Sequence, residues 1–257
     1  MKIKFISFAI AFTLLACGNT ILESSKIEVK TIIETNKPAI VSEIPLPEGF
    51  KRLKTTSYGN WMRNIKLTQD NIVYYYNGDK KQNQSIHVGV LDFDIGKRDL
   101  QQCADACMRI RSEYLFENKK YKEIKFLFAN GKWGKSFANY TTKHTHKALR
   151  SYLNYVYSYA NTASLKKQLT SVSVKDIKIG DVFVQSGNPY GHAVTVMDVC
   201  ENKKGEKKFM ISQSYMPAQS IEILKNPKDN TAWYSADFIG DLNTPEWSFT
   251  SKDLKRF

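Results

Sequence analysis

Cys103, His192 and Gln213 are the residues of this 257-residue chain whose types and positions could together perform chemistry. A cysteine can attack a carbonyl carbon as a thiolate, a histidine can take up and return the proton, and a polar side chain can hold the imidazole in position. The three residues come from separate segments, as the members of a nucleophile, base and orienter triad commonly do. The set predicts a cysteine hydrolase that acts on an amide bond and needs no metal or other cofactor.

The expected nucleophile, Cys103, falls in the first turns of a predicted helix. The positive end of a helix dipole favours a thiolate, so this position predicts a lowered pKa for the thiol. The backbone N–H of Cys103 and the side chain of Gln102 are the expected donors to an oxyanion formed on the substrate.

Each member of this triad also has a purely structural interpretation. Cys103 shares an apolar stripe with Leu100 and Cys107 and could be a small core residue. His192 could be a structural histidine, and Gln213 could be an ordinary hydrogen-bonded strand residue. The combination of the three, rather than any one of them, favours a site.

Four aromatic residues are the expected walls of a substrate cleft: Tyr190, Tyr215, Trp133 and Trp233. Large aromatic side chains suit a cleft, but they suit a protein core equally well. The sequence leaves both interpretations open.

Two other groups of residues predict less. His144 and His146 have strand spacing but no identified third ligand, so they do not predict a zinc site. Cys103 and Cys107 lack the Cys-x-x-Cys spacing of thioredoxin-like proteins, which disfavours a redox function. If Cys17 is lipidated, an odd number of cysteines remains, and we expect a free thiol rather than a disulfide framework.

The helix that carries Cys103 is expected to begin at Asp99, with Gln102 completing a capping box. Asp105, Arg109 and Glu113 line its polar face, where i,i+4 pairs can form. A second helix is expected over residues 148–163.

Runs of β-branched and aromatic residues between turn signals predict the strands. The order of strands, helices and then an antiparallel meander is typical of an α+β fold. The expected strands are residues 72–76, 86–93, 182–184, 192–199, 208–213 and 220–224.

The N-terminus predicts export and a lipid anchor. A short basic start, an apolar run and the sequence Leu-Leu-Ala-Cys ending at Cys17 are typical of a lipoprotein signal peptide over residues 1–16. Acyl chains on Cys17 would attach the protein to a membrane. Residues 17–42 are expected to be the lipidated N-terminus and a flexible tether, and residues 43–257 a single globular domain.

The formal net charge of +13 favours polyanionic partners or simple solubility. Outside the cytoplasm these polyanions would be envelope polymers or lipid headgroups. The basic runs are not interleaved with aromatic residues, and the sequence predicts no nucleic-acid binding.

Two short stretches resemble known cell-wall hydrolases. The Gly180-Asp181 turn with its apolar strand, and Gly191-His192 opening the next strand, are similar to the histidine-bearing half of NlpC-type and CHAP-type enzymes. This resemblance implies a papain-like fold, with Cys103 as the nucleophile and Gln213 in the place of the third polar residue. It also implies an insertion between Cys103 and Gly180.

A second resemblance covers nearly the whole chain after Cys17 and is to a bacterial lipoprotein family named only as domain of unknown function 4846. It implies no activity. The segments that carry it are Leu100–Ala106, Arg109, Arg111, Glu113–Leu115, Tyr159–Leu165, Gln213–Gln219, Trp233-Tyr234 and Thr244–Trp247.

Together these observations predict a lipid-anchored protein of the bacterial cell envelope with an α+β, papain-like domain. The expected function is a cysteine hydrolase, an amidase or peptidase, acting on an envelope substrate such as a peptidoglycan peptide. The alternative is a non-catalytic lipoprotein of the same fold that binds an envelope polymer or a protein partner.

Overall fold

The computed structural model describes residues 37–238 and 240–257. The signal peptide predicted for residues 1–16, the lipidation predicted at Cys17 and the tether as far as residue 36 lie outside the described residues. The folded unit spans Lys37–Phe257. It includes residues 37–42, which the sequence assigned to the tether, because Val41 is fully buried in the core.

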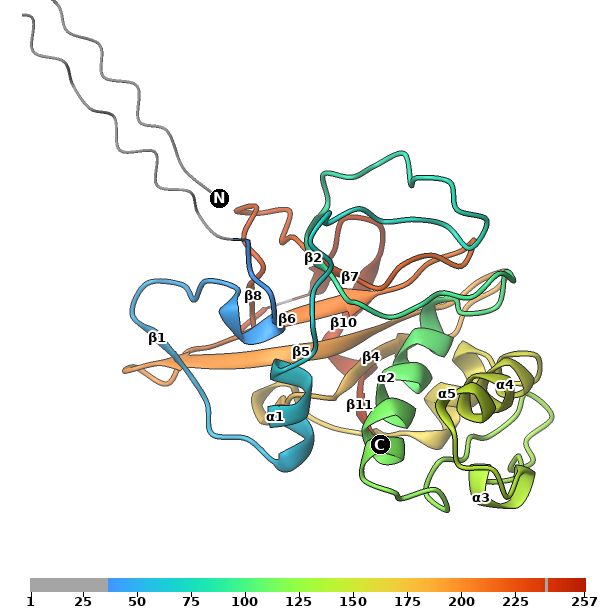
Figure 1. The fold of residues 1–257 in the computed structure, drawn as a ribbon. Helices are drawn as coiled ribbons and strands as arrows, with labels where there is room; N and C mark the ends of the chain where they lie inside the picture. Colours follow the sequence, from blue (N-terminus) through green and yellow to red (C-terminus); the bar gives the residue numbers. More distant parts are fainter. Residues whose placement is uncertain (1–36, 239) are drawn as a thin grey trace, which may run out of the picture. The chain divides into compact units, whose positions relative to one another are not determined.

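Within the described residues, a nine-stranded sheet forms the centre of the fold, and every strand pairing in it is antiparallel (Figure 1). The order along the sheet is β2-β7-β6-β5-β4-β11-β3, with β1 paired to β5 and β8 paired to β6. The strands are β1 (Phe50–Arg52), β2 (His87–Val90), β3 (Thr170–Ser171), β4 (Val182–Gln185), β5 (His192–Asn202), β6 (Lys207–Gln213), β7 (Glu222–Leu224), β8 (Tyr234–Ser235) and β11 (Leu254–Arg256).

Five α-helices occur in the described residues, and in Figure 1 they gather on one side of the sheet. Helix α2 packs on β5, and α5 packs on β4. A separate hairpin of β9 (Asp241–Asn243) and β10 (Ser248–Thr250) follows late in the chain. The helices are α1 (Ser57–Arg63), α2 (Cys103–Glu117), α3 (Phe137–Tyr140), α4 (His146–Tyr157) and α5 (Thr162–Gln168).

Two hydrophobic clusters pack on the sheet, and alternate residues of β4 divide between them. Val182 and Val184 join the cluster that contains α4 and α5. Phe183 points to the other face, where its ring lies 5.6 Å from that of Phe209 and 5.9 Å from that of Phe249. The sheet is therefore covered on both faces, which explains why its central strands are almost continuously apolar. The predicted α+β class is confirmed.

Helix α2 begins three residues later than the sequence suggested. Its N-cap is Gln102, whose backbone N–H donates to Asp105 Oδ2 at 3.1 Å. The predicted N-cap, Asp99, lies in the preceding loop, where its Oδ1 accepts hydrogen bonds from Gln102 Nε2 and the Ala218 backbone. Two consecutive capping patterns fit this sequence, and the later one forms.

The polar face of α2 is buried rather than exposed to solvent. Arg109 is only 1% exposed and pairs with Glu113 as the i,i+4 spacing predicted. Its guanidinium also pairs with Asp94, at 3.0 Å. A buried charge needs such partners. These ion pairs allow the polar face of α2 to be buried as well as its apolar face.

Other boundaries also differ from the predicted ones. Residues 72–76 form only isolated bridges, Tyr74 with Lys80 and Tyr75 with Gln219, instead of a strand. The helix predicted over residues 148–163 is two helices, because the Asn161 side chain accepts from the Ser164 N–H and starts α5. In the part of the chain that the structure describes, no helix is long and apolar enough to cross a membrane.

Candidate functional site

The folded chain brings Cys103, at the start of α2, to the beginning of β5. The thiol donates to the backbone oxygen of Gly191, with a sulfur-to-oxygen distance of 4.0 Å. The Ala193 N–H lies close enough to the sulfur to lower the pKa of the thiol. Cys103 therefore lies against the backbone immediately before and after His192. Among the described residues, no hydrogen bond joins this thiol to the His192 ring.

His192 and Gln213 meet directly, as the sequence predicted. His192 Nε2 lies 2.9 Å from Gln213 Oε1, and both residues are 1% exposed. The pairing of β5 with β6 places them together, since Thr195 lies opposite Ser212 in that pair.

Two carboxylates and a buried lysine surround the amide nitrogen of Gln213. Gln213 Nε2 donates to Glu222 Oε1 at 3.1 Å and to Glu246 Oε2 at 2.6 Å. Lys81 Nζ donates to the same two oxygens, at 2.8 and 2.7 Å. Glu222, which is fully buried, also accepts from Gln219 Nε2. This cluster of Lys81, Gln213, Gln219, Glu222 and Glu246 is called the polar cluster below.

The polar cluster determines how the Gln213 amide must be oriented. Its NH₂ group faces two carboxylate oxygens, which can only accept, so its carbonyl oxygen must face His192. A carbonyl oxygen accepts, and His192 Nε2 therefore carries the proton. The other ring nitrogen, Nδ1, keeps its lone pair and can act as a base.

The charges of Cys103 and His192 differ from those of a thiolate and imidazolium pair. Burial, with a smaller contribution from Asp105, raises the pKa of Cys103 to about 12, although three backbone N–H groups oppose the shift. Burial lowers the pKa of His192 to about 4. The lowered thiol pKa predicted from the helix N-terminus is therefore wrong for this structure: desolvation outweighs the helix end. At neutral pH the site holds a neutral thiol and a neutral imidazole.

A pocket of about 310 Å³ opens beside Cys103 and includes Gln102, Tyr157, Asn161 and Tyr190 in its lining. Asp105 and Tyr157 line it, and Asp105 Oδ1 and the Tyr157 hydroxyl are buried without a hydrogen-bond partner among the described residues. Burial raises the pKa of Asp105 well above its usual range. The two unpaired groups could therefore bind polar atoms of a ligand.

The two predicted tyrosines and Gln102 lie at the site. Tyr190 lines the Cys103 pocket and is 62% exposed. The Tyr215 ring centroid is 4.9 Å from that of His192. Gln102 lines the same pocket, and its amide donates one proton to Asp99, which leaves the second for a ligand.

The two predicted tryptophans do not line the pocket at Cys103. Trp133 follows a tight turn, across which it is bridged to Leu127, and it lies next to Lys125. Trp233 is a core residue, 2% exposed, whose Nε1 donates to the Pro45 carbonyl. The tryptophan that contacts His192 is Trp247, with ring centroids 5.3 Å apart.

The remaining histidine and cysteine candidates have structural contacts. His144 stacks on Tyr121, and His146 Nε2 lies 2.9 Å from Glu113 Oε1. Cys103, Cys107 and Cys200 are free and buried. Over residues 37–238 and 240–257, no group of His, Cys, Asp and Glu side chains is arranged to hold a metal ion.

Sequence reasoning missed the polar cluster apart from Gln213. Lys81 comes from a loop, Glu222 from β7 and Glu246 from the turn before β10. The Lys81 to Glu246 contact spans 165 residues. One signal was Glu222 within an otherwise apolar strand, because a buried carboxylate requires partners. Gln219 and Glu246 also fall within the segments that resemble domain of unknown function 4846.

The comparisons with curated proteins and with solved structures gave no match. A family model, described as Domain of unknown function (4846), matches residues 40–143 and 132–256. These matches cover α2, β5, β6 and the polar cluster, so the candidate site lies entirely within the family's domain. The chain belongs to the family of domain of unknown function 4846.

Proposed function

We propose that this protein is a cysteine hydrolase that cleaves an amide bond, with Cys103 as nucleophile, His192 as base and Gln213 as orienter. The observation that carries the proposal is the fixed Gln213 amide. The polar cluster leaves only its oxygen for His192, which sets the imidazole tautomer that a base needs at Nδ1.

In this reaction the Cys103 sulfur attacks the substrate carbonyl carbon while its proton passes to His192 Nδ1. The carbonyl oxygen becomes an oxyanion, and the Cys103 N–H and the Gln102 side chain donate to it. The C–N bond then breaks, and His192 returns the proton to the leaving amine. Water hydrolyses the resulting thioester by the same steps and restores the thiol.

The neutral resting state suits a mechanism in which proton transfer accompanies attack. The only hydrogen bond that the thiol donates is the 4.0 Å contact with the Gly191 oxygen, which is weak. Rotation about the Cys103 side-chain bond would release this contact, as attack on a substrate requires.

The proposal extends to the fold and the location. We assign the α+β domain to the papain-like class on the helix N-terminal cysteine, the histidine opening a central strand and the polar residue on the next strand. A lipid on Cys17 would hold the protein at the cell envelope, and peptidoglycan peptides or anionic envelope polymers would be within reach.

The test is cleavage of purified peptidoglycan peptides by the full-length chain in a nonionic detergent, with products identified by mass spectrometry. We expect cleavage by the wild type and by Cys107→Ser, the matched control one turn along α2. Cys103→Ser should abolish cleavage. The same products from Cys103→Ser, or no cleavage by the wild type, would contradict the proposal.

The alternative is a non-catalytic binding protein, and the burial of the site favours it. Cys103 is 5% exposed, and its pKa of about 12 makes it unreactive in the resting state. Under this alternative the same peptides would bind without cleavage, and Cys103→Ser would bind as the wild type does.

A further inference from the structure

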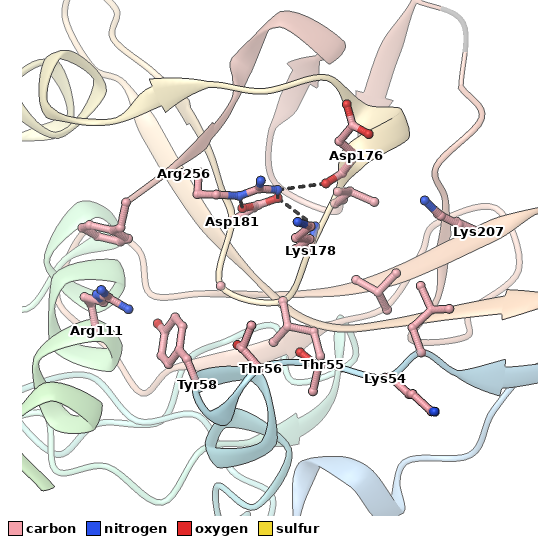
Figure 2. Close-up of a pocket in the computed structure, with 16 residues that line it drawn as sticks. Lys54, Thr55, Thr56, Tyr58, Arg111, Asp176, Lys178, Asp181, Lys207 and Arg256 are labelled. Atoms are coloured by element: carbon pink, nitrogen blue, oxygen red, sulfur yellow. Dashed lines mark hydrogen bonds and ion pairs between the residues drawn. The ribbon is translucent and has the colours of Figure 1, made fainter. Parts of the chain in front are cut away.

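A second pocket, of about 670 Å³, lies away from Cys103 (Figure 2). It is bounded by the segment before α1, by the turn before β4 and by the end of β11, with Arg111 of α2 on one side. It shares no lining residue with the pocket at Cys103 and is about twice as large. Arg111 is eight residues beyond Cys103, which corresponds to about 12 Å along the helix.

One ion pair in this pocket is already complete. Arg256 Nε and Nη2 lie 2.6 and 2.8 Å from the two oxygens of Asp181. The Lys178 backbone N–H donates to the same carboxylate, at 2.8 Å. Asp181 therefore has no remaining capacity to neutralise another cation.

The Arg111 guanidinium, in contrast, has no carboxylate within salt-bridge distance among the described residues. Three aromatic rings hold it: Tyr58, Tyr114 and Phe257, with centroids 4.9, 5.9 and 5.6 Å away. Figure 2 shows it beside Tyr58 at one end of the pocket. Contacts with ring faces fix the position of a cation without using its N–H donors.

The lining as a whole carries an excess of positive charge. The only carboxylate side chains among its lining residues are Asp181, which Arg256 occupies, and Asp176, whose carboxylate points away from the centre of the pocket in Figure 2. Against these two stand five cationic side chains: Lys54, Arg111, Lys178, Lys207 and Arg256. The side chains of the lining residues thus carry three more positive than negative charges, and one of the cations, Lys207, donates to the Lys175 carbonyl.

The rest of the lining is apolar with a few hydroxyl groups. Leu53, Ile177 and Ile179 provide aliphatic surface. Thr56 Oγ1 accepts from the Gly59 N–H, so its own proton is available to a ligand. The walls therefore suit a molecule with an apolar body, whereas the charges suit an anionic group.

We propose that this pocket binds a small organic anion, a carboxylate or a phosphate ester, whose charged group pairs with Arg111 and whose apolar part lies along Leu53 and Ile177. Guanidinium groups bind both kinds of oxyanion in a bidentate manner. This function is independent of the hydrolase proposal, because no residue of the polar cluster or of the Cys103 pocket lines this pocket.

The test is isothermal titration calorimetry of the full-length chain in a nonionic detergent at low salt. The probes are benzoate, phenyl phosphate and the neutral analogue benzamide. We expect saturable binding of at least one anion, weakening with added salt, and no detectable binding of benzamide. Tighter binding of phenyl phosphate would identify the ligand as a phosphate ester, and tighter binding of benzoate as a carboxylate.

Two variants locate the binding. Arg111→Met should weaken it about tenfold or more, since one charge-assisted pair is lost. Lys178→Met, a change at an exposed residue, should weaken anion binding by a smaller factor. If Arg111→Met fails to fold, the affinity of Lys178→Met tests the proposal. The matched control, Arg98→Met, removes an exposed arginine outside the pocket and should bind as the wild type does.

Three results would overturn the proposal. The first is the absence of saturable binding by either anion. The second is unchanged affinity in folded Arg111→Met and Lys178→Met proteins. The third is binding of benzamide as tightly as benzoate.

Discussion

Replacing Lys81 with methionine should destabilise the protein strongly at neutral pH. Lys81 is 5% exposed and pairs with Glu222 and Glu246 at 2.8 and 2.7 Å. Methionine fills a similar volume but supplies no charge. The fully buried Glu222 carboxylate would then lose its lysine partner, while Glu246, at 23% side-chain exposure, keeps some contact with water.

The expected cost follows from the exposure of these groups. Breaking a buried ion pair by removing one partner costs about 3–5 kcal/mol, chiefly because the other charge remains buried. For a domain of this size, that corresponds to a fall in melting temperature of roughly 6 to 20 °C. The amide hydrogen bonds from Gln213 and Gln219 to Glu222 would reduce the loss.

The effect should depend on pH in a direction that can be worked out. In the wild type, burial opposes ionisation of Glu222, but His87 and Lys81 outweigh it and lower its pKa. That stabilisation is present above the unfolded value of about 4.3 and is lost as the pH falls through the folded pKa. Without Lys81 we expect burial to raise the pKa of Glu222. The stability gap between the two proteins should then narrow as the pH falls through the raised pKa of Glu222 in the variant, so that it is smaller at pH 4 than at pH 7.

The assay is thermal and urea unfolding of the wild type, Lys81→Met, Glu222→Gln and the double variant, at pH 7 and pH 4. Glu222→Gln should recover much of the stability that Lys81→Met loses, since it removes the unpaired charge. A loss below about 1 kcal/mol at pH 7, which is the range of an exposed pair, would refute the argument from burial. Equal losses at both pH values would refute the assignment to Glu222.

Three further predictions follow from the site. With a pKa of about 12, Cys103 should react with iodoacetamide at pH 8 about 2,000-fold more slowly than an ordinary thiol of pKa about 8.5. Site-resolved mass spectrometry measures this rate, and rapid labelling of the folded protein would contradict the prediction. His192, whose pKa is about 4, should be a neutral Nε2–H tautomer at pH 7 in histidine NMR spectra. Because the folded pKa of His192 lies below the unfolded value of about 6.5, this histidine should reduce the stability of the protein by about 3 kcal/mol as the pH falls from 6.5 to 4. A titration midpoint near 6.5 in the NMR spectra would argue against burial of the ring. Trp133→Ala should change the free energy of unfolding by less than about 1 kcal/mol, since the residue is 55% exposed. It should also leave peptide cleavage or binding unaffected, because Trp133 does not line the pocket at Cys103. An altered rate of cleavage would show that Trp133 does contribute to the site.

The central strands, and the contact between His192 and Gln213, could be predicted because their signals are local. Gly191 before an apolar run marked the start of β5 at His192, and the next apolar run ended at Gln213 where β6 ends. Two such strands joined by a hairpin turn pair with each other. Local pattern and tertiary structure agree here.

The start of α2 and the conformation of residues 72–76 could not be predicted from local signals. Asp99 and Gln102 both begin plausible capping patterns, and the tertiary contact of Asp99 with the Ala218 backbone favours the later start. Residues 72–76 have strand-forming side chains, but only single bridges reach them. Strand propensity alone does not supply a partner.

The ionisation states and the polar cluster were beyond the sequence for a different reason. The thiol pKa depends on how completely Cys103 is buried, and the sequence indicates only that a helix end is near. The contacts of Lys81 with Glu222 and Glu246 join residues far apart along the chain. Such pairings are products of the whole fold rather than of any segment.

The burial of strand β5 predicts which amino-acid substitutions the protein will tolerate. Nine consecutive residues, 192–200, are buried, because the sheet is covered on both faces. A half-exposed strand accepts polar substitutions at every second codon. In a saturation mutagenesis map, β5 should instead appear as an unbroken intolerant block, and tolerance should return only at Glu201 and Asn202, where the strand reaches solvent.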